Sequence, residues 1–219
     1  MTWLHGLDVS VCQGKIDWAL VPESERFVVC KISEGTSLDP LGAINVEGAR
    51  ESGRIVGAYA FGRPSPGKAR EHFRKLWDGF GDTMPDLPLV LDLETTGGLS
   101  GQAVVDYAAE WDAEREVFTA VTPLLYTGAY FLEQLHADLS PLHHLPLWLA
   151  QYSHRGAWTP VEGKNTPRVP EGWETWAMWQ YSGDGGQRVA GIHADVDRNV
   201  FNGTEPDLRR LCGQPDAGV

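Results

Sequence analysis

Asp92 and Glu94 are the two residues whose types and spacing could most directly do chemistry. They close an aliphatic run that follows Pro88 and is broken by Gly97 and Gly98. Such a run is typical of a buried strand, and residues two apart on a strand point to the same side. Two neighbouring carboxylates cannot both ionise freely, so one of them is expected to hold a proton near neutral pH. The pair could therefore be an acid catalyst or part of a metal site.

Other acidic residues stand near the ends of further predicted strands. They are Asp8, Glu34, Asp195 and Asp197. In a barrel of parallel strands the C-terminal strand ends meet at one face, so acids from distant parts of the chain would gather in one cleft. Such a cleft can protonate a glycosidic oxygen and support positive charge on a sugar ring. It can equally hold divalent metal ions for phosphoryl chemistry.

Strand-like and helix-like segments alternate along the first two thirds of the chain. Strands are predicted over residues 6–9, 26–32, 55–61, 87–93, 121–126, 146–150, 175–181 and 192–197. Helical periodicity occupies residues 41–52, 67–80, 102–118 and 129–135. Residues 141–182 are rich in Pro, Gly and Trp, so loops are expected to join the strands there. We expect an α/β fold, a modified TIM-like eight-stranded barrel with about five helices.

Composition narrows the class of protein and of partner. We expect a single catalytic barrel domain over residues 1–213, followed by a short tail over 214–219. The net charge of −12 disfavours nucleic acid as a partner, whereas nine Trp favour stacking on carbohydrate. No apolar run has the length of a membrane span, and the N-terminus lacks the pattern of a signal peptide. We expect no membrane insertion, and a monomer.

Short motifs in a fixed order along nearly the whole chain resemble those of one family. They are DVS at 8–10, FVVCKISEG at 27–35, GAYAF at 57–61, LPLVLDLE at 87–94, LYT at 125–127, LWLAQY at 147–152, WQYS at 179–182 and VDRNVFNG at 196–203. On these motifs the chain resembles glycoside hydrolase family 25, the Chalaropsis-type lysozymes. The resemblance implies an N-acetylmuramidase on a barrel with five helices, whose last three strands lack them.

The resemblance also implies roles for the acidic residues. Glu94 would be the proton donor to the β-1,4 linkage between N-acetylmuramic acid and N-acetylglucosamine, and Asp92 would flank it. Asp8 and Asp197 would complete the acidic floor. Asp197 is preferred to Asp195 because the motif's Asn follows it by two residues and the Phe by four. We expect the substrate's own acetamido oxygen to attack C1, with Asp92 orienting it, so that the product retains its anomeric configuration.

Aromatic and polar residues near the strand ends would bind the glycan. The family implies Tyr59, Phe61, Tyr126, Trp148, Trp179 and Tyr181. Alternation along a strand sends about half of such residues into the core, and we place Tyr126 and Trp148 in the groove. Gln180 is polar on an apolar strand and should hydrogen-bond the substrate or a catalytic acid. Lys31 in a buried strand needs an acidic partner, for which Glu34 is the nearest candidate.

Two alternatives stay open at this point. The run from Asp92 to Gly97 resembles the first motif of the DnaQ-like exonucleases, in which acids bind two metal ions. That motif normally opens its domain, whereas residues 1–91 precede it here. A non-catalytic wall-binding barrel is the second alternative, and the presence of all four acids disfavours it.

For the muramidase we expect no cofactor and no metal. Its partner would be the glycan strands of bacterial peptidoglycan. A phage endolysin, made in the host cytoplasm without a signal peptide and acting on the cell wall after release, fits this description.

Overall fold

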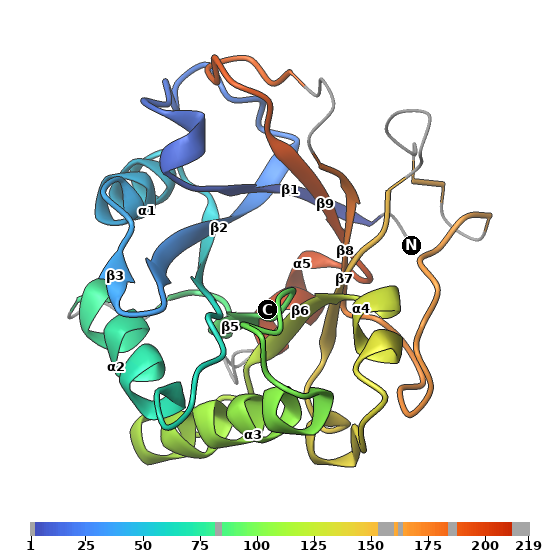
Figure 1. Cartoon of the computed structure of the whole chain (residues 1–219). Coiled ribbons are helices and arrows are strands. Elements are labelled where there is room, and N and C mark those ends of the chain that lie inside the picture. Colours follow the sequence, from blue (N-terminus) through green and yellow to red (C-terminus); the bar gives the residue numbers. More distant parts are fainter. Residues whose placement is uncertain (1–2, 82–84, 153–159, 162–163, 184–187, 212–219) are drawn as a thin grey trace.

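A closed barrel forms the centre of the molecule in the computed structural model, which describes residues 3–81, 85–152, 160–161, 164–183 and 188–211. Its strands are β1 (Leu4–Val9), β2 (Glu25–Glu34), β3 (Ser37–Leu38), β4 (Ile55–Phe61), β5 (Val90–Asp92), β6 (Leu124–Gly128), β7 (Leu147–Ala150), β8 (Met178–Ser182) and β9 (Asp197–Phe201). Within the described residues, eight of these close into a ring because β1 pairs with both β2 and β9 (Figure 1). The short β3 only extends the edge of β2. The expected eight-stranded barrel is therefore confirmed.

Strand direction decides which residues reach the functional face. The ring has seven strands that run parallel to one another, namely β1, β2 and β4 to β8. The eighth strand, β9, is antiparallel to both of its neighbours, β1 and β8. The C-terminal ends of the parallel strands meet at one face, and β9 begins there with Asp197. The strand predicted over residues 192–197 is therefore wrong. Its apolar members Ile192 and Val196 are buried, but in the connection before β9.

Helices cover the outside of the barrel over part of its circumference (Figure 1). They are α1 (Gly42–Glu51), α2 (Ala69–Phe80), α3 (Gly101–Phe118) and α4 (Ala129–Gln134), with 3-10 turns η1 (Val11–Gln13) and η2 (Ser140–Leu142). Each α-helix of this set matches a predicted helical segment. The side chain of Ser100 caps α3 by accepting from the backbone N–H of Ala103. In the described part of the chain, no helix is long and apolar enough to cross a membrane.

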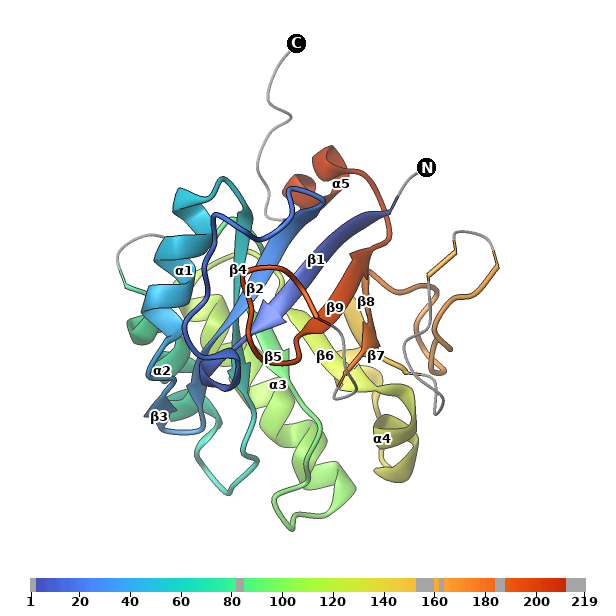
Figure 2. The same cartoon turned by 90° about the horizontal axis from the view of Figure 1, so that it is seen from above.

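A fifth helix, α5 (Glu205–Arg210), follows the last strand and has no counterpart among the predicted segments. It lies at the end of the barrel opposite to the point of the β1 arrow (Figure 2). Leu208 on α5 is fully buried in the cluster that fills the barrel, together with Phe27 and Phe201. The helix thus closes the N-terminal end of the barrel.

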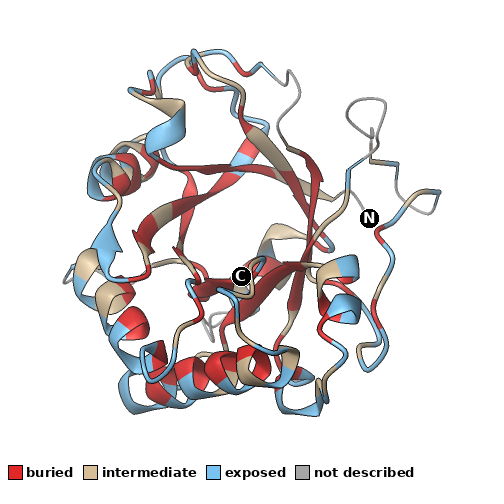
Figure 3. Ribbon diagram, in the orientation of Figure 1, coloured by how far each residue is buried: buried red, intermediate tan, exposed pale blue. Residues whose placement is uncertain are grey.

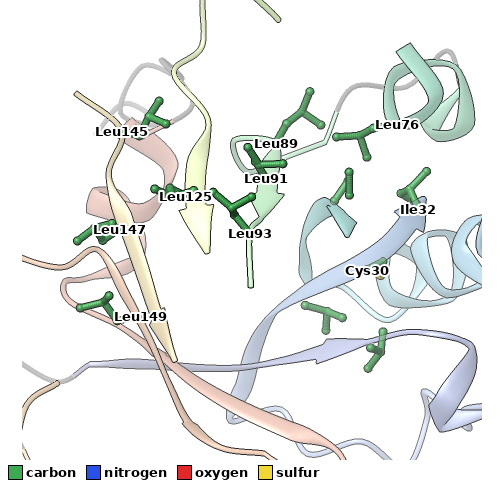
Figure 4. Packing of buried hydrophobic residues seen from close by; sticks show 14 of the residues in the cluster. Cys30, Ile32, Leu76, Leu89, Leu91, Leu93, Leu125, Leu145, Leu147 and Leu149 are labelled. Atoms are coloured by element: carbon green, nitrogen blue, oxygen red, sulfur yellow. The ribbon is translucent and has the colours of Figure 1, made fainter. Parts of the chain in front are cut away.

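Alternation along the strands divides the core into two layers. Outward-facing aliphatic residues pack between the barrel and its helices, among them Leu91, Leu93, Leu125, Leu147 and Leu149 (Figure 4). Inward-facing residues fill the barrel, among them Val90, Tyr126, Trp148 and Met178. Trp179 and Tyr181 belong to the outer layer, and Cys30 is a buried free thiol there. The expected domain boundary at residue 213 and the tail over 214–219 lie outside the described residues.

Candidate active site

Three acids from distant strands converge at the C-terminal face of the barrel. Asp8 near the end of β1 is the register partner of Asp197 at the start of β9, and Asp92 ends β5. Tyr59 on β4 is close enough to all three for their charges to act on it. Burial raises the pKa of Tyr59, and the negative charges of Asp8, Asp92 and Asp197 raise it further. The predicted acidic cleft therefore receives carboxylates from the first, middle and last strands of the barrel.

Asn199 fixes one side of Asp8. The indole Nε1 of Trp148 can only donate, and it donates to Oδ1 of Asn199 at 2.9 Å. The amide nitrogen Nδ2 of Asn199 is thereby directed to Oδ2 of Asp8, to which it donates at 2.7 Å. Trp148 is 2 % exposed and acts from inside the barrel. Trp148, which the sequence analysis placed in the groove, therefore supports Asp8 through Asn199. Its ring offers little surface for stacking on a sugar.

Gln180 binds the same oxygen of Asp8 as Asn199 does. Its Oε1 accepts hydrogen bonds from the hydroxyls of Tyr126 and Tyr152, each at 2.7 Å. Its Nε2 then faces Asp8 and donates to Oδ2 at 2.9 Å. Of the two partners expected for Gln180, the substrate or an acid of the site, the structure shows the hydrogen bond to an acid. Two side-chain amides thus hold Asp8 in one orientation. Hydrogen bonds from Trp148, Tyr126 and Tyr152 in turn orient the two amides.

Burial controls the charge of the two inner acids. Desolvation raises the pKa of Asp8 to about 6, against the hydrogen bonds from Asn199 and Gln180. Burial also raises the pKa of Asp92 well above its usual range, and the charges of Glu94 and Asp8 add to this effect. Asp92 is 6 % exposed, and its Oδ1 has no hydrogen-bond partner among the described residues. Asp92 therefore favours the protonated form, whereas Asp8 binds its proton only below about pH 6.

Glu94 lies just beyond the strand and is exposed, in contrast to Asp92. The chain leaves β5 through two main-chain hydrogen bonds: Gly62 donates to the carbonyl of Asp92 at 2.7 Å, and Leu93 donates to the carbonyl of Tyr126 at 2.9 Å. These bonds extend the strand pairing to the residue before Glu94. The carboxylate of Glu94 thus stands at the mouth of the barrel on a well-fixed main chain.

Phe61 and its cationic neighbours form the side of the cleft next to β2. Phe61 is the register partner of Asp92. Nζ of Lys31 lies 5.0 Å and Cζ of Arg63 lies 4.4 Å from the centre of its ring. Both cations also bind Glu34, Lys31 at 2.5 Å and Arg63 through Nε at 2.9 Å. The expected pairing of Lys31 with Glu34 is confirmed, and Arg63 is a partner that the sequence patterns did not indicate.

Asp195, the rival to Asp197, lies outside this network. Its carboxylate pairs with Arg188 at 3.3 Å in the connection before β9. Its carbonyl accepts a hydrogen bond from Gln13 at 2.9 Å. Within the described ranges, no group of three or more His, Cys, Asp or Glu side chains is arranged to hold a metal ion.

Two residues of the site escaped the sequence analysis. Asn199 and Tyr152 both stand inside motifs on which the resemblance rests, yet neither was singled out as a site residue. The signal for Asn199 is the same as that for Gln180, because a polar side chain on an apolar strand must find a partner when it is buried. Tyr152 is 45% exposed just beyond β7, so burial gives no such signal for it.

Parallel strands whose carboxyl ends carry convergent acids, in a barrel partly ringed by helices, define a glycoside hydrolase type of site. Glycosyl hydrolases family 25 matches residues 7–191, and the chain belongs to this family. The chain is 33% identical to Lysozyme M1 from Streptomyces globisporus over 221 residues, which cover 95% of this chain and 71% of that protein.

Solved structures agree with the family. The bacterial lysozyme from Streptomyces coelicolor is 30% identical with a TM-score of 0.81, and the alignment covers 97% of this chain and 98% of that one. The family 25 lysozyme from Aspergillus fumigatus is 26% identical with a TM-score of 0.78, covering 96% and 99%. The fold is therefore that of the family 25 lysozymes. Because the chain belongs to a glycosyl hydrolase family, the exonuclease alternative is dropped.

Proposed function

We propose that this glycoside hydrolase is a muramidase, which cuts the β-1,4 bond between N-acetylmuramic acid and N-acetylglucosamine in peptidoglycan. The observation that carries the proposal is the pairing of an exposed acid, Glu94, with a buried acid, Asp92, at the mouth of a family 25 barrel. The lysozymes among its relatives support the choice of bond.

Glu94 is the proton donor in this proposal. In the free enzyme, burial favours the proton on Asp92, whose pKa is raised. A glycan that covers Glu94 removes its solvation and so favours the protonated form of Glu94. The proton then passes to the linkage oxygen as the bond to C1 breaks. The exposed position allows Glu94 to exchange protons with solvent between turnovers.

Asp92 assists the attack on C1. Asp92 ends β5 at the mouth of the barrel and keeps 6 % of its surface exposed, so its carboxyl group can accept from the N–H of the substrate's 2-acetamido group. That contact would turn the acetamido oxygen toward C1, where it displaces the leaving sugar and forms a cyclic intermediate. Water then opens the intermediate, and two displacements at C1 retain the anomeric configuration.

Asp8 and Asp197 complete the acidic floor beneath the sugar ring, and the fixed orientation of Asp8 supports this role. Tyr59, Phe61, Tyr126, Trp148 and Gln180 are proposed as the binding side of the same cleft. The last three act partly through Asp8 and its amides. No cofactor enters the mechanism. We expect a monomeric barrel that meets glycan strands in the cell wall after release from the cytoplasm.

Glu94→Gln tests the proposal. The variant should bind purified peptidoglycan but release reducing ends about 10² to 10⁴ times more slowly, since it cannot donate the proton. Glu116→Gln is the matched control, because Glu116 lies exposed on α3 away from the cleft. NMR of fresh product should show the retained anomer.

Three outcomes would contradict parts of the proposal. Full activity in Glu94→Gln would remove Glu94 as the donor. An inverted anomer would exclude the acetamido route. Wild-type protein that binds the wall yet releases no sugar ends would favour the wall-binding alternative.

A further inference from the structure

A cavity of about 550 Å³ opens between β3 and the start of α2, beside the proposed catalytic cleft. Its lining includes four basic side chains, which are Lys31, Arg63, Lys68 and His72. Glu34 and Asp39 are the acidic residues of the lining. In a chain with a net charge of −12, a cavity whose basic groups outnumber its acidic ones is an unusual local environment.

The acids of the cavity are already occupied. Glu34 binds both Lys31 and Arg63, as described above. Asp39 accepts from the backbone N–H groups of Val11 at 3.0 Å and Leu41 at 2.8 Å. Their carboxylates are therefore turned to partners in the fold, and the donors left for a ligand are Lys68, His72 and the N–H groups that Lys31 and Arg63 do not use on Glu34.

His72 is one such donor. It is only 4 % exposed, yet it lines the cavity, and its Nδ1 lies 2.9 Å from the hydroxyl of Tyr107. Burial raises the pKa of the Tyr107 hydroxyl, which therefore keeps its proton and can donate it to Nδ1 of His72. In that arrangement the neutral ring carries its own proton on Nε2.

Nε2 of His72 is directed toward the cavity. It has no hydrogen bond within the described residues. A Cβ atom at Gly35 would lie 3.6 Å from this nitrogen, so Gly35, with φ +53, leaves the approach to the ring open. A buried N–H donor that faces an open cavity between cationic side chains is suited to a carboxylate.

Arg63 and Lys68 add charge at the rim. Both are about half exposed, and Lys68 also pairs with Glu71 at 2.6 Å on the surface of α2. Arg63 contacts the ring of Phe61, the register partner of Asp92, so the cavity and the cleft share one wall. A glycan in the cleft could therefore extend a substituent into the cavity.

We propose that this cavity binds a carboxylate of the short peptide attached to the lactyl group of muramic acid. The inference rests on the proposed muramidase function, and it makes the enzyme selective for glycan that still carries its peptides. Carboxylates of the peptide would accept from His72 and from the Arg63 and Lys68 side chains. Glycan that has lost its peptides carries a free lactyl carboxylate, which is the other group that could bind here. The experiment distinguishes the peptide carboxylate from the lactyl carboxylate.

Kinetics on two soluble glycans provide the test. One carries its peptides, and the other has been stripped by an amidase, which leaves the lactyl carboxylate. Wild-type kcat/KM should be about tenfold higher for the first, as expected for one charged hydrogen bond. In Lys68→Gln, KM for the peptide-bearing glycan should rise toward that of the stripped glycan, with little change in kcat. Arg63→Gln should show the same loss of preference for the peptide-bearing glycan. Lys164→Gln, an exposed change of the same charge, should keep the preference.

The outcomes are distinguishable from those of the proposed function. If wild-type protein cuts neither glycan, the muramidase proposal fails. If it cuts both equally well, the function stands and the peptide site is overturned. If Lys68→Gln and Arg63→Gln weaken the cleavage of both glycans alike, the cavity binds the lactyl carboxylate or only supports the cleft, and the peptide site is again overturned.

Discussion

The carboxylate of Asp8 shows how surroundings set the charge of one residue. Two amides donate to it, but burial outweighs them and raises its pKa from 3.8 to about 6. The folded protein therefore holds a proton on Asp8 at pH values where the unfolded chain has already released it. For an acid with a raised pKa, the free energy of unfolding falls as the pH rises through this interval.

Asp8→Asn should remove the loss of folding stability that accompanies ionisation of Asp8. Asparagine keeps an oxygen that can accept from both amides and cannot ionise. Below pH 3.8 the variant should match the wild type in stability. Above pH 6 it should be more stable by up to about 3 kcal/mol, the free energy that corresponds to the shift from 3.8 to about 6. Urea unfolding at pH 3.5 and pH 7.5 measures both differences, and activity should fall as stability rises.

Asp195→Asn is the control for this prediction, because Asp195 lies in a partly exposed connection and pairs with Arg188. Its stability relative to the wild type should change little between the two pH values. An Asp8→Asn variant that is less stable than the wild type at pH 7.5 would show that the charge of Asp8 holds the two amides in place.

Residue types and strand ends were sufficient to predict the acids but not their supports. Asp8, Asp92 and Asp197 could be found because acids at strand ends are visible in the sequence. The partners of Asp8 come from β8 and β9, far away along the chain. Only the register between these strands brings them together, and register is a property of the closed sheet.

At the scale of elements, β9 shows where periodicity misleads. Ile192 and Val196 alternate with polar residues as a strand would, but they are buried in a connection. The strand begins at Asp197 because β9 is antiparallel to its neighbours and enters the barrel from the functional face. A sequence pattern gives spacing but not direction, so it could not distinguish an acid that ends a strand from one that begins it.

An ion pair stabilises the closure of the barrel at β1. Arg198 on β9 binds Glu25 on β2, so the pair spans β1, the strand between them. Glu25 is buried, and its Oε2 has no hydrogen-bond partner in the described part of the chain. Removing the arginine would therefore leave a buried carboxylate without compensation, which is more costly than the loss of a surface pair.

Arg198→Met should lower the free energy of unfolding by about 3 kcal/mol, measured by urea unfolding at pH 7. The double variant Arg198→Met with Glu25→Leu should recover most of this loss, because no unpaired charge stays buried. Arg26→Met is the matched control: Arg26 pairs with Glu205 in a more exposed position and should cost at most about 1 kcal/mol. If Arg198→Met and Arg26→Met lowered the free energy of unfolding equally, the pair of Arg198 with Glu25 would not be more important for stability than a surface pair.

The whole molecule separates its polar and apolar surfaces around the barrel. The sheet is almost entirely buried, while the outer faces of the helices are exposed (Figure 3). Those faces carry much of the charge, which totals −12 over the chain. Bacterial walls are themselves anionic, since their peptides carry carboxylates. Protein and wall therefore repel one another at long range, and the cationic cavity acts only at short range.

Added salt should consequently speed the attack on intact walls. The Debye length falls from about 30 Å at 0.01 M to about 10 Å at 0.1 M, which screens repulsion between the protein and the wall. The rate of clearing of a wall suspension should rise severalfold over this range, as expected for an association limited by electrostatic repulsion. On a short soluble glycan, which carries few charges, the rate should change much less, because the long-range repulsion that opposes its binding is weak. Slower clearing at 0.1 M salt would instead show that local cations, such as those of the cavity beside the cleft, dominate the approach to the wall.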